Sequence, residues 1–299
     1  MSKLGYILRC VRNMNYKNML NTVNTVHKKS GKNRVGLFCD MVWCGFKYGT
    51  GHRDYDLNEW WTLNKAQRST YITRGINNSI VTRLNDSSYY HLLDNKIHFN
   101  EHFSDCLGRK WLNLENASLE EFEVFMEDLE SVIAKPIDAT CGQGVVKLQK
   151  SDFESLSAMY DHIKETRAFL VEEYVVQHSE ISKLYPLSVN TLRIVTVTSD
   201  DGTPHVLYAF IRMGNGGRVV DNINAGGMAA PIDLETGKIS GVAFDKHYSY
   251  YDTHPYTGTA IVGHQIPFWK ESCDFALEAC KRIPQLRYIG WDVAVTENG

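Results

Sequence analysis

The chain has 299 residues, of which 43% are hydrophobic and 22% are charged, and its formal net charge at pH 7 is −3. This is an ordinary globular composition, sufficient for one large domain or for two to three lobes. The slightly acidic balance argues against a general nucleic-acid-binding protein. No apolar run approaches the about 18 residues of a membrane span, and we expect no secretion signal at the N-terminus.

The cysteines point to a reducing environment. The chain contains seven of them, and none forms a C-x-x-C pair or a metal-binding spacing. An odd number without such patterns is typical of reduced thiols in a cytosolic protein. The cysteines are Cys10, Cys39, Cys44, Cys106, Cys141, Cys273 and Cys280.

The charge is unevenly distributed along the chain. Residues 1–39 contain eight Lys or Arg and no acid, whereas the other 24 basic and 35 acidic residues give the rest of the chain a net charge of −11. Apolar residues recur near helical spacing in this basic arm, for example at Leu4, Leu8 and Val11. Residues 1–34 therefore either make a weak contact with an anionic membrane surface or pack one face on their own protein.

The first third of the chain is predicted to be mostly helical. Residues 1–30 indicate one or two helices, and Gly31 follows as a stop. Residues 35–62 combine many aromatic residues with glycines, and we expect an aromatic-rich loop and cap there. Residues 64–76 are expected to be helical, and residues 87–103 to be helical or irregular.

Two capping-box patterns predict helices further along. Ser118-Leu119-Glu120-Glu121 opens a helix whose apolar face extends to Leu129. Ser151-Asp152-Phe153-Glu154 is expected to open another helix that ends near Thr166.

The stretch between these helices, from Val132 to Leu148, is the most suggestive of chemistry. A short apolar strand ends at Lys135 and Pro136, and a second strand follows the glycine-containing loop 138–144. Glycines let backbone N–H groups approach phosphate oxygens, and a lysine supplies a positive charge. The stretch therefore either holds a polyphosphate or is a β-hairpin whose lysine faces water. It lacks Gly-Lys-Ser/Thr and is not a P-loop.

Strands dominate the second half. A strand is expected around residues 169–176, an antiparallel pair at 192–198 and 205–213, and a further pair around the turn at 235–237. An amphipathic helix at residues 270–283 and a strand at 288–296 follow. Helices first and strands later favour a multi-lobed α+β enzyme over a doubly wound sheet.

Several motifs stand in one order along the chain. They are Asp94-Asn95-Lys96, Lys135 with its loop, the acidic strand 171–176 followed by Glu180, Ser188 to Thr196, Val220 to Gly227, His254 to Gly258, and Ile289 to Ala294. In this order they resemble the ATP-grasp superfamily, and more narrowly the sugar-transfer-associated ATP-grasp family of surface-polysaccharide gene clusters, of teichuronopeptide type.

The resemblance implies an α+β ATP-grasp fold in which the nucleotide is held between two α+β lobes. It divides the chain into a basic helical segment (1–34), an N-terminal lobe (35–115), a small lobe with lysine and lid (116–180) and a large lobe (181–299). The implied cofactors are ATP and Mg²⁺.

The resemblance also implies the nucleotide site. Lys96 and Lys135 hold phosphates, loop 138–144 covers them, backbone groups of the hinge pair with adenine, and Glu180 accepts the ribose hydroxyls. Structural ion pairing is the alternative for each carboxylate, and Glu172, on the opposite face of the strand, could pair with a structural lysine. The nucleotide-binding set is Lys96, Lys135, Gly142, Gln143, Gly144, Glu173, Tyr174, Val175, Val176 and Glu180.

The implied catalytic residues are Arg212, Arg193 and Asn222. Arg212 suits a γ-phosphate or acyl-phosphate oxygen, whereas Arg193 binds either a substrate carboxylate or an acid of the protein. A second set is expected near the acceptor substrate, although its loop is equally explained as a tight polar turn. That set is Asp221, Asn224, Gly226, Gly227 and His254.

Asp292 is the implied Mg²⁺ ligand. In the family, a Glu-x-Asn strand that follows supplies further ligands, but the printed chain stops at Gly299, and Glu297 and Asn298 belong to a turn. We therefore expect either a truncated large lobe or an incomplete metal site, with weak Mg-ATP binding that a longer chain would restore.

The implied activity is that of an ADP-forming carboxylate–amine ligase, acting through an acyl phosphate. It would modify a cell-surface polysaccharide or its precursor with an amino acid or amine, at the cytoplasmic side of the cell envelope. One alternative is an ATP-grasp kinase for a sugar or alcohol, with Asp221 or His254 as base. Another is a non-catalytic ATP-binding partner of a glycosyltransferase. The acceptor is a small molecule or glycan, and no nucleic-acid partner is expected.

Overall fold

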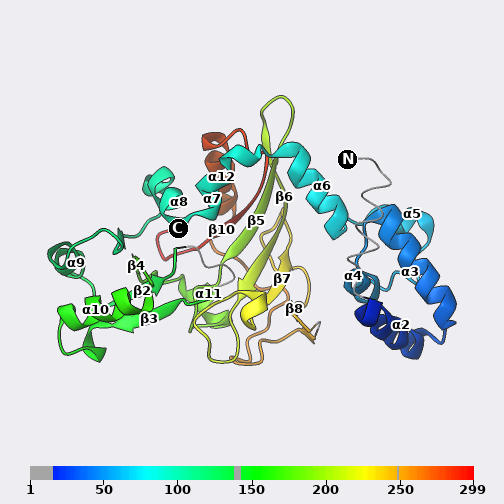
Figure 1. Ribbon diagram of the computed structural model, residues 1–299, viewed down its shortest axis with the longest axis horizontal. Helices are drawn as coiled ribbons and strands as arrows, with labels where there is room; N and C mark the ends of the chain where they lie inside the picture. Colours follow the sequence, from blue (N-terminus) through cyan, green and yellow to red (C-terminus); the bar gives the residue numbers. More distant parts are fainter. Residues whose placement is uncertain (1–15, 138–142, 248) are drawn as a thin grey trace. The chain divides into compact units, whose positions relative to one another are not determined.

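The computed structural model describes residues 16–137, 143–247 and 249–299, and the chain divides into two compact units, Met1–Leu84 and Asn85–Gly299 (Figure 1). The boundary at residue 84 falls inside the lobe expected at 35–115, and the four-part division remains a prediction. Within the described part, no helix is long and apolar enough to cross a membrane.

The first unit is entirely helical in its described part. Its helices are α2 (Tyr16–Ser30), α3 (Arg34–Tyr48), α4 (His52–Leu57), α5 (Lys65–Arg68) and α6 (Arg74–Leu84). The predicted helix end near Gly31 is confirmed, because α2 stops at Ser30. The Asn33 side chain caps α3 by accepting hydrogen bonds from Val35 N and Gly36 N, and Gly49 ends α3 in a left-handed conformation.

The expectation of an aromatic-rich loop at residues 35–62 is wrong. Leu37, Met41, Cys44 and Tyr48 recur at helical spacing, and all four are buried on one face of α3. They form a core with the buried face of α2 and with the fully buried Trp60. The apolar face of α2 is therefore used inside its own unit, whereas residues 1–15 of the basic arm lie outside the described residues.

The second unit begins with short helices and a small antiparallel sheet. The helices are α7 (His91–Asp94), α8 (Lys96–His102), α9 (Leu119–Phe125), α10 (Leu156–Thr166) and α11 (Ser179–Leu184), with 3₁₀ turns at Ser87–Tyr89, Ser104–Cys106 and Lys150–Asp152. The small sheet has the order β1-β4-β2-β3, with β1 (Trp111–Asn113), β2 (Ser131–Lys135), β3 (Val146–Gln149) and β4 (Leu170–Glu173). The two strands predicted on either side of loop 138–144 are confirmed, and they pair antiparallel, with Val132 opposite Leu148.

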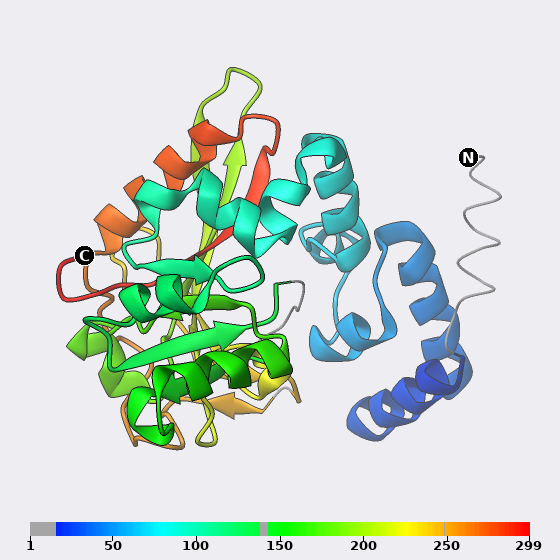
Figure 2. The same cartoon turned by 60° about the vertical axis from the view of Figure 1, so that its left-hand side comes forward.

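Helices α9 and α10 cover one face of the small sheet (Figures 1 and 2). Val132, Ala134 and Val171 are buried against them. Because side chains alternate along a strand, Lys135 on β2 and Glu172 on β4 lie on the opposite face. The sheet thus presents a lysine and a carboxylate on the face that the helices leave open.

The capping box at Ser118 is confirmed: Ser118 Oγ accepts from Glu121 N at 3.2 Å, and Glu121 Oε2 accepts from Ser118 N at 2.7 Å. The predicted helix start at Ser151 is wrong. The Asp152 carboxylate accepts from Gln149 N and stabilises a 3₁₀ turn, and Ser155 caps α10 instead.

Ser118→Ala is expected to lower the free energy of unfolding by about 1 kcal/mol, because it removes one N-cap acceptor from α9. Urea denaturation compares this variant with Ser151→Ala, whose serine caps no helix and which is expected to change stability by less than about 0.5 kcal/mol. Equal losses would contradict the assignment of the cap.

The large sheet has the order β10-β5-β6-β7-β8-β9 and is antiparallel throughout its paired strands. Its strands are β5 (Leu192–Thr198), β6 (Pro204–Met213), β7 (Met228–Ile232), β8 (Ala243–Asp245), β9 (Tyr250–Tyr251) and β10 (Tyr288–Val293), and a 3₁₀ turn spans Ile223–Ala225. The β5–β6 pair and the final strand were predicted correctly.

Helix α12 (Trp269–Arg282) packs on one face of the large sheet, as its amphipathic pattern predicted. Ile194 on β5 and Trp291 on β10 belong to the core beneath it. Asp292 follows Trp291 in the strand and is exposed, so the predicted alternation of β10 is confirmed. Asp292 therefore lies on the face of the large sheet opposite to the one that α12 covers.

Candidate active site

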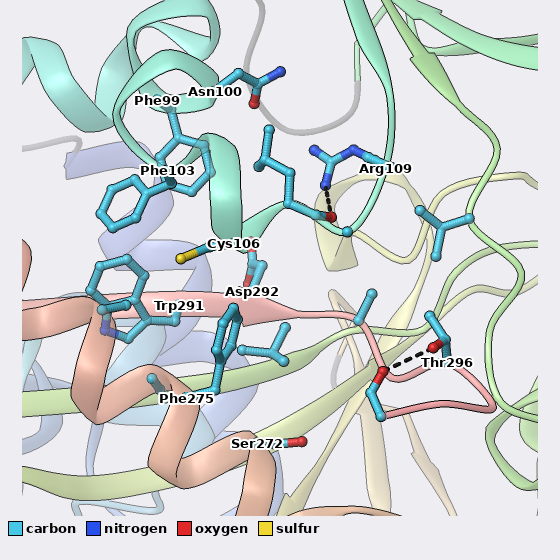
Figure 3. Close-up of a pocket in the computed structure, with 18 of the residues that line it drawn as sticks. Phe99, Asn100, Phe103, Cys106, Arg109, Ser272, Phe275, Trp291, Asp292 and Thr296 are labelled. Carbon is cyan, nitrogen blue, oxygen red and sulfur yellow. Dashed lines mark hydrogen bonds between the residues drawn. The ribbon is translucent and has the colours of Figure 1, made fainter.

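A cavity of about 720 Å³ lies within the second unit and reaches both sheets. Helix α8, the end of β2, the edge strand β10 and helix α12 contribute its walls. Figure 3 shows Phe99, Phe103 and Trp291 together at one side of it, and Phe103 contacts both other rings edge-on or tilted. A largely apolar cavity with a few charged groups is the usual form of a small-molecule site.

Two predicted phosphate-binding lysines line this cavity. Lys135 ends β2, where Pro136 stops the ladder, and Lys96 begins α8, where the Asn95 side chain caps the helix. Lys96 Nζ donates to the carbonyl oxygens of Pro136 at 3.1 Å and Ile137 at 2.8 Å. These two hydrogen bonds join α8 to the chain just beyond Lys135, so the fold brings the two lysines to one cavity.

A buried carboxylate, Glu172, holds Lys135. Lys135 Nζ lies 2.6 Å from Glu172 Oε2, and Arg109 Nη2 lies 2.9 Å from Glu172 Oε1. The Asn100 amide also donates to Oε1, at 3.1 Å. Burial alone would raise the pKa of Glu172, but the charges of Lys135 and Arg109 outweigh it and lower that pKa to about 2. The carboxylate is therefore ionised at neutral pH.

Arg109 and Asn100 are site residues that the sequence reasoning missed. Both line the cavity, and Figure 3 shows them at the same end of it. Arg109 Nη1 donates to the Leu107 carbonyl, while its Nε is buried and has no hydrogen-bond partner among the described residues. Neither residue lies in a recognisable local pattern. Only their hydrogen bonds with Glu172, which is 63 positions from Arg109 and 72 from Asn100, identify them as site residues.

On the large sheet, two arginines share Asp292. Arg193 Nε and Nη2 donate to its two oxygens at 2.6 and 2.9 Å, and Arg212 Nη1 reaches both oxygens at 3.1 and 3.0 Å. Arg212 Nη2 also donates to Asp221 at 2.8 Å. Burial would lower the pKa of Arg212, but Asp221 and Asp292 outweigh it and raise that pKa. Thus four of the predicted residues, Arg193, Arg212, Asp221 and Asp292, form one network.

The predicted adenine hinge follows β4. Val175 lines the cavity, whereas the exposed Val176 does not. The Glu173 carboxylate accepts from Lys110 N at 3.0 Å, and the Tyr174 ring lies under Lys147 Nζ at 3.5 Å from the ring centroid. The side chains of Glu173 and Tyr174 are thus engaged within the small sheet, and the adenine contact of the hinge backbone remains a prediction.

Glu180 lies in the first turn of α11 and is not among the residues that line the cavity. Its carboxylate accepts from Lys183 Nζ at 2.6 Å, and this hydrogen bond lowers the pKa of Glu180. The pair is exposed to solvent, so its lysine can move away at little cost. A ribose contact for Glu180 remains a prediction.

The polar loop after Asp221 is a tight turn. The Asn222 side chain accepts from Asn224 N at 2.8 Å, and Gly226 adopts a φ of +101°. A Cβ at Gly227 would lie 2.3 Å from the Asp221 carbonyl oxygen, so only glycine fits there. These contacts account for the loop's composition, and its predicted substrate role remains a prediction.

The surroundings of His254 indicate a role in the structure of the fold. It is completely buried and stacked on Tyr185, and one ring nitrogen lies 3.0 Å from the Gly214 carbonyl oxygen. The other nitrogen accepts from Tyr256 N at 3.2 Å. Burial lowers the pKa of His254. With both nitrogens engaged by backbone groups, the ring is poorly placed to accept a proton from a substrate.

Only part of the predicted lid can be described. Gly142 and Cys141 lie outside the described residues, while Gln143 and Gly144 are exposed. Gly144 has a φ of +69°, and a Cβ there would lie 2.8 Å from Pro136 Cγ. The glycine therefore lets the returning chain pass close to the proline after Lys135.

Comparison with known families connects this geometry to a fold. The sequence profile of the sugar-transfer-associated ATP-grasp proteins matches residues 75–299, three quarters of the chain and the whole of the second unit. The chain belongs to the sugar-transfer-associated ATP-grasp family. The expected superfamily, family and α+β ATP-grasp fold are thereby confirmed.

Solved structures of other proteins are similar to this chain at low sequence identity. They include the ATP-grasp ligase PsnB complexed with a minimal precursor (15% identity, TM-score 0.40, covering 78% of this chain and 58% of that one). The D-alanine–D-alanine ligase of Bacillus anthracis is similar at 13% identity and a TM-score of 0.40, covering 74% and 60%. The chain thus spans less than two thirds of the length of these proteins. No curated protein matched the chain.

The residues present fit a magnesium ion that is shared with a phosphate ligand, not one held by the protein alone. The described residues contain no group of three or more His, Cys, Asp or Glu that could hold a metal. Asp292 is partly exposed, with its side chain 40% accessible, and it lines the cavity. Mg²⁺ is often bound by one or two carboxylates together with phosphates and waters.

Proposed function

We propose that this chain is an ATP-dependent carboxylate–amine ligase. The observation that carries the proposal is the single cavity lined by Lys96 and Lys135 from one side and by Asp292 from the other. Two lysines suit a polyphosphate, and arginines clustered at Asp292 suit the charge of a phosphoryl group in transfer. The family assignment makes ATP the nucleotide.

In the proposed reaction, a carboxylate oxygen attacks the γ-phosphorus of ATP and ADP leaves, giving an acyl phosphate. An amine then attacks the acyl carbon and releases inorganic phosphate, so that an amide bond forms. Lys96 and Lys135 neutralise phosphate oxygens, and the planar guanidinium group of Arg212 is suited to bind the transferred phosphoryl group. No side chain acts as a covalent nucleophile, because the protein contributes mainly position and charge.

Mg²⁺, when bound, would supply further neutralisation of the phosphates. Asp292, which lines the cavity, is the residue that we propose would hold it. Arg193 and Arg212 donate hydrogen bonds to both of its oxygens. We infer that incoming phosphate oxygens draw these arginines away and make Asp292 available to the metal.

The arrangement supports a ligase over a kinase. A kinase needs a general base at its hydroxyl acceptor, for which Asp221 and His254 were the candidates. Asp221 is buried and accepts hydrogen bonds from Arg212 and from the Thr191 backbone N–H and hydroxyl. Since His254 is also fully engaged, neither is free to receive a proton.

The family's association with sugar transfer supports a role in the synthesis of a glycan, which we propose to be a surface polysaccharide. The proposed product is an amide between an amino acid or amine and a carboxylate, one of them carried by the glycan or its precursor. A membrane-surface contact by the basic arm, and a glycosyltransferase partner, complete the proposal.

The test is a screen of carboxylate and amine pairs with Mg-ATP by mass spectrometry. An amide together with ADP and free phosphate is the expected result. A stable phosphoester would identify a kinase, and ATP binding by calorimetry without any product would identify a non-catalytic protein. A folded chain that binds no ATP would overturn the proposal.

Glu180→Ala is expected to weaken ATP binding about tenfold while leaving inorganic triphosphate binding nearly unchanged, because only ATP carries the ribose hydroxyls. Calorimetric titration with both ligands measures this difference. Lys183→Ala, which removes only the exposed partner of Glu180, is the matched control and should bind both ligands like the original chain. Equal losses for the two ligands in Glu180→Ala would contradict the ribose contact.

A further inference from the structure

The small sheet places a fixed negative charge directly behind the phosphate-binding lysine. Ile133 pairs with Glu172 and Lys135 with Leu170, so the side chains of Lys135 and Glu172 stand diagonally on the same face of neighbouring strands. The central position of β4, hydrogen-bonded to β1 and β2, fixes the backbone of Glu172 on both sides. Its carboxylate therefore has little freedom to follow a bound nucleotide.

The two oxygens of Glu172 have separate partners. Oε1 accepts from Arg109 Nη2 and from the Asn100 amide, whereas Oε2 accepts from Lys135. Arg109 and Asn100 thus orient the carboxylate, and the remaining oxygen points to the lysine. The Glu172 side chain is only 6% exposed, and a buried carboxylate in such a position is stable only because it is paired and hydrogen-bonded.

Glu172 favours the charged form of Lys135. Its side chain is 18% exposed, and burial is the main influence that lowers its pKa. Glu172 raises that pKa, while Arg109 lowers it. Besides Arg109, the other charged groups that line the cavity are Lys96 on α8, Glu271 on α12 and Asp292 on β10, each on a separate element. Glu172 is the one described carboxylate that forms an ion pair with Lys135.

We propose that Glu172, oriented by Arg109 and Asn100, is a positioning residue that keeps Lys135 aimed into the cavity and positively charged for a nucleoside triphosphate. Glu172 acts through Lys135 and does not itself touch the nucleotide. The inference rests on the proposed function, since it concerns how the same site binds ATP.

Glu172→Gln keeps the shape of the side chain and one acceptor oxygen, but it removes the charge and replaces the other oxygen by an NH2 donor. In this variant the pKa of Lys135 falls, so the amine loses its proton as the pH rises. ATP affinity of the variant is expected to fall about tenfold between pH 7 and pH 9, against less than about twofold for the original chain. Calorimetry at several pH values measures the slope. A merely structural role would weaken binding equally at every pH.

Arg109→Gln makes the opposite change. Removing this cation raises the pKa of Lys135, so the affinity of the variant is expected to stay constant up to pH 9. Both substitutions break the buried ion pair between Arg109 and Glu172, so damage to the fold would change ATP binding by the two variants in the same direction. Asp128→Asn, which removes an exposed ion pair with Lys110 near the same sheet, is the matched control and should keep the original profile.

A direct readout separates this inference from the proposed function. Carbon-13 methylation of the lysine amines gives NMR signals whose pH titration reports each pKa, and the signal missing from Lys135→Arg identifies Lys135. A lower Lys135 pKa in Glu172→Gln and a higher one in Arg109→Gln are expected, whether or not ATP binds. Unchanged values in both would overturn the inference, and Arg109→Gln decides alone if Glu172→Gln does not fold. A chain that shows these shifts but binds no ATP would overturn the proposed function instead.

Discussion

Arg212→Ala is expected to lower the free energy of unfolding of the second unit by about 3 kcal/mol or more. Arg212 and Asp221 are both largely buried, with side chains 13% and 10% exposed. Removing the guanidinium leaves Asp221 with hydrogen bonds from Thr191 but without a positive charge. Breaking a buried ion pair by removing one partner typically costs about 3–5 kcal/mol, because the other charge stays buried.

Arg193→Ala is the matched control for this prediction. Arg193 donates to the same Asp292, but both side chains are about a third or more exposed, at 30% and 40%. An exposed pair contributes about 1 kcal/mol or less. Urea denaturation of the two variants should therefore give clearly different midpoints. Similar losses would mean that burial around Asp221 does not govern the stability of this network.

A double variant tests the cause. Asp221→Asn removes the charge that Arg212→Ala leaves unpaired, so combining the two substitutions should recover part of the lost stability. If the double variant is less stable than Arg212→Ala by the full cost of a second independent substitution, the unpaired charge is not the source of the effect.

Lys135→Ala is expected to weaken ATP binding by about 2 kcal/mol, or roughly 30-fold, because it removes a charge-assisted contact to phosphate. Glu172 then keeps only Arg109 as an ion-pair partner and adds repulsion near the phosphates. Lys110→Ala removes an exposed lysine that precedes β1, next to the same sheet, and should bind ATP normally. Calorimetry on folded variants makes the comparison. Unchanged affinity in Lys135→Ala would exclude the phosphate-binding role.

One further variant tests whether the loss of ATP affinity in Lys135→Ala comes from a lost phosphate contact or from the unpaired charge of Glu172. In Lys135→Ala with Glu172→Gln, neither the lysine nor its carboxylate is charged. If the lysine acts mainly by neutralising Glu172, this variant should bind ATP nearly as well as the original chain. If it binds phosphate directly, as we propose, most of the 30-fold loss should persist.

Local sequence pattern predicted the elements whose formation depends on near neighbours. The capping box at Ser118, the β5–β6 hairpin and the alternation of Trp291 with Asp292 are all confirmed. The aromatic residues and glycines between 35 and 62 misled the prediction, because they are more conspicuous than the helical spacing of Leu37, Met41, Cys44 and Tyr48. Asp152 shows a similar conflict, since its side chain stabilised a turn where a helix start was expected.

The sequence by itself determined the family, because the order of its motifs is a property of the chain. It also placed Lys96, Lys135, Val175 and Asp292 among the candidate residues, and all four line one cavity. Only the tertiary structure decided the charge partners of these residues. Lys135 meets Glu172 from 37 positions away, and Asp292 meets Arg193 and Arg212 from 99 and 80 positions away. Such ion pairs depend on strand pairing, which brings the two side chains close, and on burial, which makes their charges depend on each other. Neither leaves a local pattern in the chain.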